Sequence, residues 1–527
     1  MAVPSLSCLL VLAGLSAASA LWQEDLTPRR YVPLDERSML RFAGNVSHKD
    51  HFRLLENDGS SLLIGARNIV FNISLTDLTE RRDERLEWHS EPQDVQLCIM
   101  KGLDEEACHN YIRVLAKRGD DQLFVCGTNS YKPKCRHYQK HPDVGYLPKG
   151  GQRDGRGLCP YDPNHNSTVT FVDGETYAGT VADLASSDPL IYRDKRPLRT
   201  DKLELKQLNG TFNSWGTWHT WPGPEAPSFV GSMDYGDHVY FFFRETAVEY
   251  INCGKRSYSR VARVCKKDRG GPYKYKNKWT SFLKSRLNCS IPGEYPFYFD
   301  EIQSISTVQS GVYGGRPEEV LYAVFTTPVN SIPGSAICAF RMADLVDTFA
   351  GAFKHQEDMN SNWLPLKNSQ VPSPRPGLCV NDSRQLSDAH LNFIQSHPLM
   401  DWRHNGRVLK AVNAASGSGT VRAEPVLIEE LEVLASGAAI TNLLVSRQPD
   451  APPRLIVVTD DEVRALPLHR CGDKAVRCAD CVRLQDPYCG WEAAGQRCAP
   501  VDSPCLARGR GRSAERQSRR PSALSAQ

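Results

Sequence analysis

A recurring strand unit is the feature of this sequence that most constrains its fold. Each copy is an apolar strand, a step that contains Gly or Thr, and a second apolar strand. The copies span Leu62–Leu75, Leu123–Thr128, Val169–Val181, Val239–Tyr250, Leu321–Phe340 and Leu455–Leu468. One supersecondary unit repeated along a chain is typical of propellers and other repeat folds. Because a propeller sets small antiparallel sheets around an axis and keeps their edges short, the repeat predicts a mainly β chain that forms a β-propeller.

The spacing of the copies widens after Val239, which predicts an insertion in the middle of the repeat. We place this insertion at Lys266–Ser290. Within it, Trp279–Leu287 (WTSFLKSRL) has the amphipathic pattern of a short helix.

Residues 1–20 have the pattern of a secretory signal peptide. An apolar run from Leu6 to Leu15 is followed by small residues that end in Ala18-Ser19-Ala20, the A-x-A form of a cleavage site. The mature chain is therefore expected to begin near Leu21. No later stretch has the roughly 18 to 20 apolar residues that a transmembrane helix needs, so the sequence as written predicts an extracellular, secreted product.

The cysteines and the glycosylation motifs agree with that compartment. Of the 17 cysteines, Cys8 lies in the signal peptide, which leaves an even number in the mature chain and favours disulfides over reduced thiols. Six N-x-[ST] motifs are candidate N-glycosylation sites. They lie at Asn45, Asn72, Asn166, Asn209, Asn288 and Asn381.

A small cysteine-rich module is predicted at residues 471–505. This segment is too short to bury a sufficient core, so it needs covalent staples. The C-x-x-C at Cys478 and Cys481, with Cys471 and Cys489 around it, also has the thiolate spacing of a zinc site. An oxidising compartment favours disulfides instead. Residues 506–527 are rich in Arg, Ser and Gly and are expected to be disordered.

Charge and motif content exclude several function classes. The 64 basic residues nearly balance the 61 acidic ones, so no broad field for nucleic acid or membranes is implied, and protein partners are favoured. No G-x-S-x-G nucleophile, H-E-x-x-H helix or phosphate loop occurs, and the 14 His residues lack metal-ligand spacing. The sequence predicts a binding protein with no catalytic site, metal or cofactor, and a propeller hydrolase is the disfavoured alternative.

Three short motifs each have a functional and a plainer interpretation. Arg118-Gly119-Asp120 spells an integrin-binding tripeptide, but turn chemistry before a strand explains it as well, so an integrin partner is disfavoured. Trp215, Trp218 and Trp221 form a W-x-x-W pattern that can be C-mannosylated, and aromatic packing on a loop is favoured. The basic tail fits heparan sulfate or a furin-type site, with a solvated disordered end as the default. Its arginines are Arg508, Arg510, Arg512, Arg516, Arg519 and Arg520.

Several segments together resemble the sema domain of the semaphorin family. They are GARNIVFNISL (Gly65–Leu75), FVCGTNSYKPKC (Phe124–Cys135), GRGLCPYDP (Gly155–Pro163), FVDGETYAGT (Phe171–Thr180), VYFFFRETAVEY (Val239–Tyr250) and RVARVCKKD (Arg260–Asp268). CADCVRLQDPYCGW (Cys478–Trp491) resembles the plexin-semaphorin-integrin (PSI) module that follows it. The sequence of the segment EYINCGKRSYSRVARVCKKD most resembles the invertebrate transmembrane semaphorins of class 1.

The resemblance implies a seven-bladed sema propeller over residues 31–470 and a PSI module over residues 471–505. It also implies an extracellular guidance ligand, typically repulsive for axons and migrating cells, that acts as a homodimer to cluster plexin receptors of the A type. The alternative is a shed plexin-like or Met-like receptor ectodomain, because those proteins also join a sema domain to a PSI module. Receptor-contacting residues carry no motif and stay unknown.

The family pattern further implies a disulfide framework. It pairs six sets of cysteines: Cys98 with Cys108, Cys126 with Cys135, Cys265 with Cys379, Cys289 with Cys338, Cys471 with Cys489, and Cys481 with Cys498. Cys478 and Cys505 then form a pair by elimination. Cys159 and Cys253 are left over, and they either pair with each other, stay free, or link two chains.

Two departures from the family pattern stand out. No membrane anchor follows the PSI module, and one repeat between Leu321 and Leu455 is only half visible. His404-Asn405-Gly406 predicts a turn and Arg407–Val412 the strand after it. His397–Trp402 stands where the family has the preceding strand, so the sequence predicts one incomplete blade near Asp401.

Overall fold

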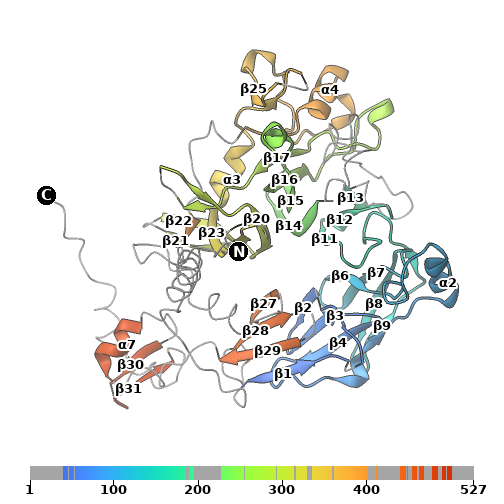
Figure 1. Cartoon of the computed structure of the whole chain (residues 1–527), viewed down its shortest axis with the longest axis vertical. Helices are drawn as coiled ribbons and strands as arrows, with labels where there is room; N and C mark the ends of the chain where they lie inside the picture. Colours follow the sequence, from blue (N-terminus) through green and yellow to red (C-terminus); the bar gives the residue numbers. More distant parts are fainter. Residues whose placement is uncertain are drawn as a thin grey trace, which may run out of the picture.

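The computed structural model of the 527-residue chain describes residues 39–184, 189–194, 227–401 and 440–500, apart from isolated positions and short stretches inside these ranges, together with Ala411 and Val412. Strands dominate these residues, which confirms the mainly β class (Figure 1). No helix within the described part of the chain is long and apolar enough to cross a membrane.

Six antiparallel sheets of three or more strands are found among the described residues, and we number them I to VI in chain order. Sheet I contains β2 (Leu54–Asp58), β3 (Ser61–Gly65), β4 (Ile69–Ser74) and β5 (Leu86–Glu87). Sheet II contains β6 (Ile112–Lys117), β7 (Gln122–Gly127), β8 (Lys134–His141) and β10 (Arg153–Asp154), with β9 (Gly145–Pro148) also paired to β8. Sheet III contains β11 (Thr168–Val172), β12 (Glu175–Val181) and β13 (Pro189–Asp194).

The other three sheets follow the same plan. Sheet IV contains β14 (Ser228–Tyr235), β15 (His238–Thr246), β16 (Ser257–Cys265) and β17 (Leu283–Arg286). Sheet V contains β20 (Glu301–Ile305), β22 (Arg316–Thr326), β23 (Ser335–Arg341) and β26 (Ala411–Val412), with β21 (Gln309–Tyr313) also paired to β22. Sheet VI contains β27 (Ile440–Ser446), β28 (Arg454–Thr459), β29 (Glu462–Pro467) and β1 (Leu40–Ala43).

The sheets are arranged around a common centre (Figure 1). The first strand of each sheet contacts the first strand of the next, from β2 to β6, β11, β14 and β20. Strand β1, near the start of the described chain, pairs with β29 near the end of the propeller and so completes sheet VI. Six sheets in the described part agree with a propeller, and the predicted count of seven blades stays a prediction because residues 413–439 lie outside that part.

Buried apolar clusters fill the spaces between neighbouring sheets. One cluster joins sheet VI to sheet I and others join I to II, II to III, III to IV and IV to V. In the cluster between sheets III and IV, for example, Tyr177 and Ile191 pack with Phe241 and Phe243. Such face-to-face burial is why the strands read as nearly continuous apolar runs.

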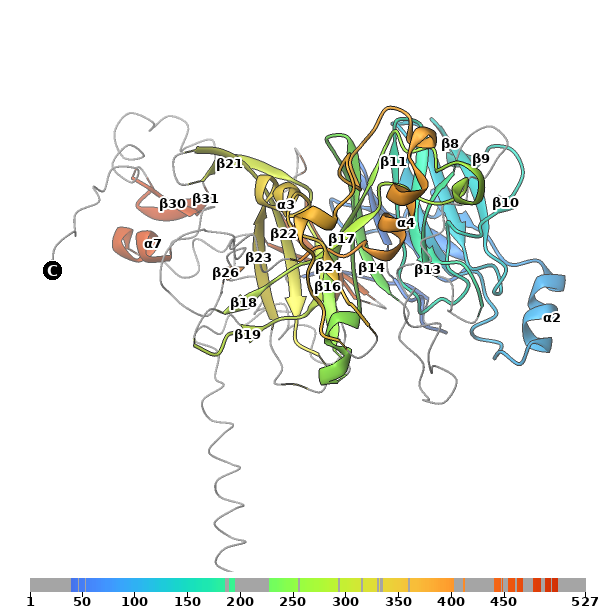
Figure 2. The ribbon, with the colours of Figure 1, turned by 90° about the horizontal axis from the view of Figure 1, so that it is seen from above.

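Short helices and two-stranded ribbons lie in the connections between the strands. The helices are α2 (Pro92–Met100), α3 (Met342–Thr348) and α4 (Asp388–Ser396), and the short 3-10 helices are η2 (Arg82–Glu84), η3 (Val248–Cys253), η4 (Tyr273–Tyr275), η5 (Asn368–Gln370) and η6 (Ser383–Gln385). Two small ribbons pair β18 (Ser290–Ile291) with β19 (Phe297–Tyr298), and β24 (Lys354–His355) with β25 (Leu364–Pro365). The cysteine-rich module contains α7 (Cys478–Leu484), β30 (Cys489–Glu492) and β31 (Arg497–Pro500), and it lies to one side of the sheets (Figure 2).

The helix expected within Trp279–Leu287 is wrong. Leu283–Arg286 is strand β17, which pairs with β16 at the edge of sheet IV. Lys284 and Arg286, the polar residues that suggested a solvated helical face, are buried. Their charges are paired in the interior, where Lys284 donates to Glu245 and Arg286 donates to Asp300. A long connection that carries α3, the β24–β25 ribbon and α4 lies further along the chain, between β23 and β26.

The segment of the predicted incomplete blade lies largely outside the described residues. Its end is visible, because Ala411 and Val412 form β26 and pair with Cys338 and Ile337 of β23. In this structure the end of the segment therefore extends sheet V.

Candidate functional site

Disulfides fix the connections to the sheets of the propeller. Cys126 and Cys135 are bonded and lie directly opposite each other on β7 and β8. Bonds also join Cys98 of α2 to Cys108, Cys265 to Cys379, and Cys289 to Cys338. The last two tie β16 and β23 to segments distant in sequence, so the long connection after β23 is covalently held to sheet IV.

In the cysteine-rich module, Cys481 is bonded to Cys498 and both are buried. Cys478 is exposed and carries no disulfide within the described part of the chain. Its predicted partner Cys505 lies outside the described residues, as does Cys471, so the pairs Cys478–Cys505 and Cys471–Cys489 stay predictions. No metal-binding group of three His, Cys, Asp or Glu is found among the described residues, although the zinc alternative involved Cys471.

The structure corrects one option for the two remaining cysteines. Cys159 and Cys253 do not pair with each other, because Cys159 is buried as a free thiol and Cys253 is exposed as a free thiol. Cys159 packs among Leu158, Leu190 and Tyr192 between sheets II and III. Cys253 lies at the end of η3. Their sequence positions carried no information about this separation, because it depends on how the sheets stack.

The candidate glycosylation sites differ in exposure. Asn381 is exposed, and Asn45, Asn166 and Asn288 are partly exposed. Asn72 is buried and its amide donates to Glu84 at 2.6 Å, which contradicts the prediction of a glycan there because a glycan needs a solvent-facing amide nitrogen. Asn209 lies outside the described residues, as do Trp215, Trp218, Trp221 and the basic tail from Arg508 to Arg520.

The Arg118-Gly119-Asp120 motif forms the turn between β6 and β7. Gly119 has a φ of +72°, in the left-handed region that glycine adopts readily. The Arg118 guanidinium donates to the carbonyl of Gly174 at 3.1 Å and lies over the Phe171 ring of the neighbouring sheet. This packing of the arginine supports the turn interpretation.

A buried ionic cluster in sheet IV was missed by sequence reasoning. Arg260 of β16 is fully buried and donates through both terminal nitrogens to Glu249 at 2.6 Å and through Nε to Glu245 at 2.9 Å. Lys284 of β17 donates to both oxygens of Glu245 at 2.7 and 2.9 Å. Two arginines inside the apolar run RVARV of β16 were the available signal, since a charge in a buried strand requires a partner.

The cluster sets the protonation of its acids. Burial alone would raise the pKa of Glu249, but the charge and hydrogen bonds of Arg260 outweigh it and lower the pKa to about 2. The same carboxylates raise the pKa of Arg260 against the effect of burial. Both groups are therefore held in their charged forms, which suits a rigid structural support rather than proton transfer.

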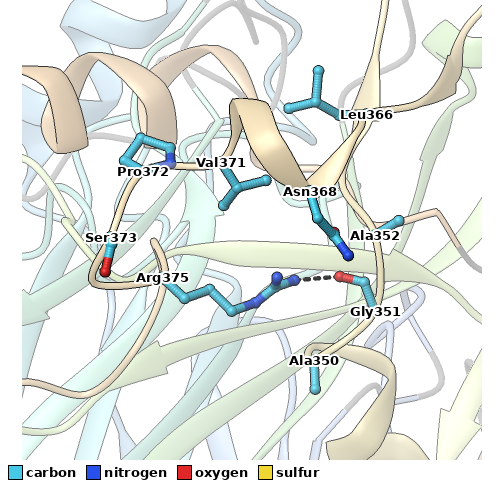
Figure 3. Close-up of a pocket in the computed structure, with 9 residues that line it drawn as sticks. All are labelled: Ala350, Gly351, Ala352, Leu366, Asn368, Val371, Pro372, Ser373 and Arg375. Carbon is cyan, nitrogen blue, oxygen red and sulfur yellow. Dashed lines mark hydrogen bonds between the residues drawn. The ribbon is translucent and has the colours of Figure 1, made fainter.

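A pocket opens in the long connection between α3 and α4 (Figure 3). It has a volume of about 560 Å³ and is lined by Ala350, Gly351, Ala352, Leu366, Asn368, Val371, Pro372, Ser373 and Arg375. The Arg375 guanidinium lies across the pocket and donates to the carbonyl of Gly351. No sequence motif marked this pocket.

Two family models match the chain. The Sema domain model matches residues 302–405, and the Plexin repeat model matches residues 470–522, which reaches beyond the predicted module end at residue 505.

Curated relatives and solved structures extend this similarity over most of the chain. Semaphorin-1A of Schistocerca americana is 50% identical and the match covers 94% of this chain and 71% of the relative, while Semaphorin-1A of Drosophila melanogaster is 47% identical over 92% of this chain and 57% of the relative. The solved structure of Drosophila Semaphorin 1a, extracellular domains 1-2, has a TM-score of 0.73 at 45% identity and covers 90% of this chain and 96% of that chain. A structure of Drosophila Plexin A in complex with Semaphorin 1b matches at 38% identity with a TM-score of 0.67, over 88% of this chain and 93% of that chain.

The Schistocerca alignment contains one further fact. It runs over 538 residues but uses only 94% of this 527-residue chain, so the relative has residues within the aligned region that this chain lacks.

Proposed function

The chain belongs to the semaphorin family, and we propose from this premise that it is an extracellular guidance ligand for the ectodomain of an A-type plexin. The observation that carries the proposal is the match to the structure of Drosophila Plexin A in complex with Semaphorin 1b, which covers 88% of this chain. Semaphorins are signalling ligands, and the described residues contain no group of metal-binding side chains, so we propose recognition without catalysis.

We propose that the ligand acts as a homodimer that clusters receptors. The exposed thiol of Cys253 supports this, because it is available for a bond between two chains. Two weak contacts on one dimer gain effective concentration, so avidity can exceed single-site affinity by about 10² to 10⁴. In this proposal the effect on axons and migrating cells is repulsive. Heparan sulfate binding by the basic tail is an additional proposal that rests on charge alone.

Surface plasmon resonance with the glycosylated chain on an immobilised plexin A ectodomain tests the receptor assignment. We expect saturable binding in the nanomolar to micromolar range, and no binding to an unrelated immobilised ectodomain. Absence of saturable binding by well-folded material would reject the assignment.

Sedimentation and non-reducing electrophoresis test the dimer separately. We expect the wild type to contain a disulfide-linked dimer that Cys253→Ser abolishes. The variant should bind plexin with the same single-site affinity but dissociate faster from a dense receptor surface. A wild type that is monomeric would reject clustering while leaving receptor binding intact.

A further inference from the structure

Two arginines beside the pocket of Figure 3 have no acidic partner among the described residues. Arg263 of β16 is only 7% exposed, and Arg375 is partly buried in the pocket wall. Neither forms an ion pair with any described side chain, although nearly every other buried cation of sheet IV does. Buried guanidinium groups are normally paired with carboxylates, so this arrangement requires an explanation.

Aromatic rings replace the missing carboxylates only in part. Arg263 lies 4.5 Å from the centre of the Phe349 ring, and Arg375 lies 4.5 Å from the centre of the Phe353 ring. A cation–π contact stabilises a charge without cancelling it. The Nε atom of Arg263 has no hydrogen-bond partner, and burial lowers the pKa of both arginines, with the neighbouring Arg263 charge adding to the effect on Arg375. The Tyr240 hydroxyl also interacts with Arg263, but burial raises the pKa of Tyr240 and keeps it neutral, so no negative charge among the described residues offsets the two guanidinium groups.

The charge reaches the pocket. Phe349, which Arg263 covers, directly precedes the lining residue Ala350, and Arg375 is itself a lining residue. Figure 3 shows the Asn368 amide and the Arg375 guanidinium pointing toward the same part of the pocket, near the Gly351 carbonyl. One Arg375 nitrogen donates to that carbonyl. A guanidinium has five N–H donors in all, so Arg375 has further donors beyond that bond.

The rest of the lining is suited to a carbon skeleton. Leu366, Val371 and Pro372 form an apolar wall opposite the polar groups. A volume of about 560 Å³ lies within the roughly 300–1,000 Å³ range of ligand pockets, which typically combine apolar walls with a few convergent polar groups.

We propose that this pocket binds a small organic oxyanion, either a carboxylate or a sulfate, with Arg375 and Asn368 as the donors and Arg263 supplying positive charge from behind. Arg375 suits this role because a guanidinium matches planar and tetrahedral oxyanions with paired hydrogen bonds. The site lies in the connection between β23 and β26, and this proposal does not rest on the plexin assignment.

Three probes that share one sugar ring test the proposal and separate its two chemistries. Glucuronate carries a carboxylate, glucose 6-sulfate carries a sulfate, and glucose carries neither. Binding to the intact chain is measured by ligand-detected NMR at constant ionic strength, so that screening by salt is the same in every sample. We expect saturable binding of at least one anion and none of glucose, and the anion that binds identifies the chemistry.

The variants place the binding in the pocket. Arg375→Gln should weaken anion binding by about tenfold or more, because a charge-assisted hydrogen bond is lost, whereas Arg375→Lys should retain part of it. The matched control is Arg156→Gln, which removes an exposed arginine that pairs with Asp154. The proposal is overturned if neither anion binds, if glucose binds equally well, or if Arg375→Gln and Arg156→Gln have equal effects.

Discussion

Phe42 of β1 lies opposite Val463 of β29, so a strand from the start of the described chain completes a sheet formed near its end. The Phe42 ring also contacts the rings of Phe52 and Phe71, which belong to the apolar cluster between sheets VI and I. Strand pairing within sheet VI and aromatic packing between sheets VI and I therefore join the two ends of the described propeller chain at the same place.

We expect Phe42→Ala to destabilise the chain by about 2 kcal/mol, less than for a fully buried phenylalanine because Phe42 is partly exposed. Arg41→Ala is the matched control on the same strand. Arg41 is 59% exposed and pairs with Glu462, so its loss should cost less than about 1 kcal/mol. Urea denaturation measures both, and equal effects would mean that closure does not depend on the aromatic contact.

Arg260→Met should lower the free energy of unfolding by about 3–5 kcal/mol, more than Phe42→Ala does. The reason is that it leaves the buried carboxylates of Glu245 and Glu249 without their main partner. The control is Arg81→Met, which removes a half-exposed arginine 3.8 Å from Glu84. Chemical denaturation at pH 7 gives both values. A change below about 1 kcal/mol for Arg260→Met would contradict the structural role of the cluster.

The same cluster predicts an acid dependence. Because the folded-state pKa of Glu249 is lowered from 4.5 to about 2, its ionised form stabilises the fold fully above pH 4.5, and this contribution is lost as the pH falls from 4.5 toward 2. We expect the stability difference between wild type and Glu249→Gln to shrink over that interval. A difference that is constant between pH 6 and pH 3 would contradict the assignment.

A histidine pair predicts a second pH response. His355 Nδ1 and His397 Nε2 are 2.8 Å apart, and the remaining His397 nitrogen is 3.2 Å from the Phe393 carbonyl, which it approaches as a donor. His397 can therefore accept from His355 only while neutral, and burial, the largest effect, lowers its pKa. A lowered histidine pKa means that this stability is present above pH 6.5 and is lost as the pH falls below it.

We expect His397→Gln to lose less stability than wild type between pH 7.5 and pH 5.5, as measured by thermal denaturation. His141→Gln, which changes an exposed histidine, should follow the wild type. If both variants track the wild type, the pair does not contribute to the acid response.

The two free thiols of the propeller should differ in reactivity. Cys253 is exposed, whereas Cys159 is fully buried and its pKa is raised by burial. Iodoacetamide added to the folded, mildly reduced chain should therefore label Cys253 but not Cys159, and denaturant should make both reactive. Peptide mapping by mass spectrometry reads out each site, and labelling of folded Cys159 would contradict its position in the core.

Restoring a segment near Asp401 should stabilise the chain. The sequence predicts half a repeat there, and the Schistocerca relative has residues within the aligned region that this chain lacks. A missing strand leaves backbone groups unpaired at about 1–3 kcal/mol for each buried group, a large part of a typical total of about 5–15 kcal/mol. We expect better secretion and a higher melting temperature for the restored form, and equal values would show that the propeller closes without it.

Local sequence patterns determined the class and many strands of the recurring unit. The first part of Val239–Tyr250 predicted β15 because strand alternation and turn chemistry are properties of neighbouring residues. The second strand expected at the end of this segment is wrong, because Val248–Cys253 forms η3. The C-x-x-C and the family motifs likewise belong to short, contiguous segments. For this reason the sema and PSI assignments followed from the sequence alone.

Only the tertiary structure decided what depends on residues distant in the chain. Three features follow from how whole sheets assemble: β1 pairs with β29, Leu283–Arg286 pairs with β16 as a strand where a helix was expected, and Cys159 lies apart from Cys253. The surroundings of the pocket also depend on distant residues. Arg263 belongs to β16 and Arg375 to the connection between β23 and β26, and these two segments meet only after folding. Burial and charge pairing are properties of the packed assembly, so no local pattern encodes them.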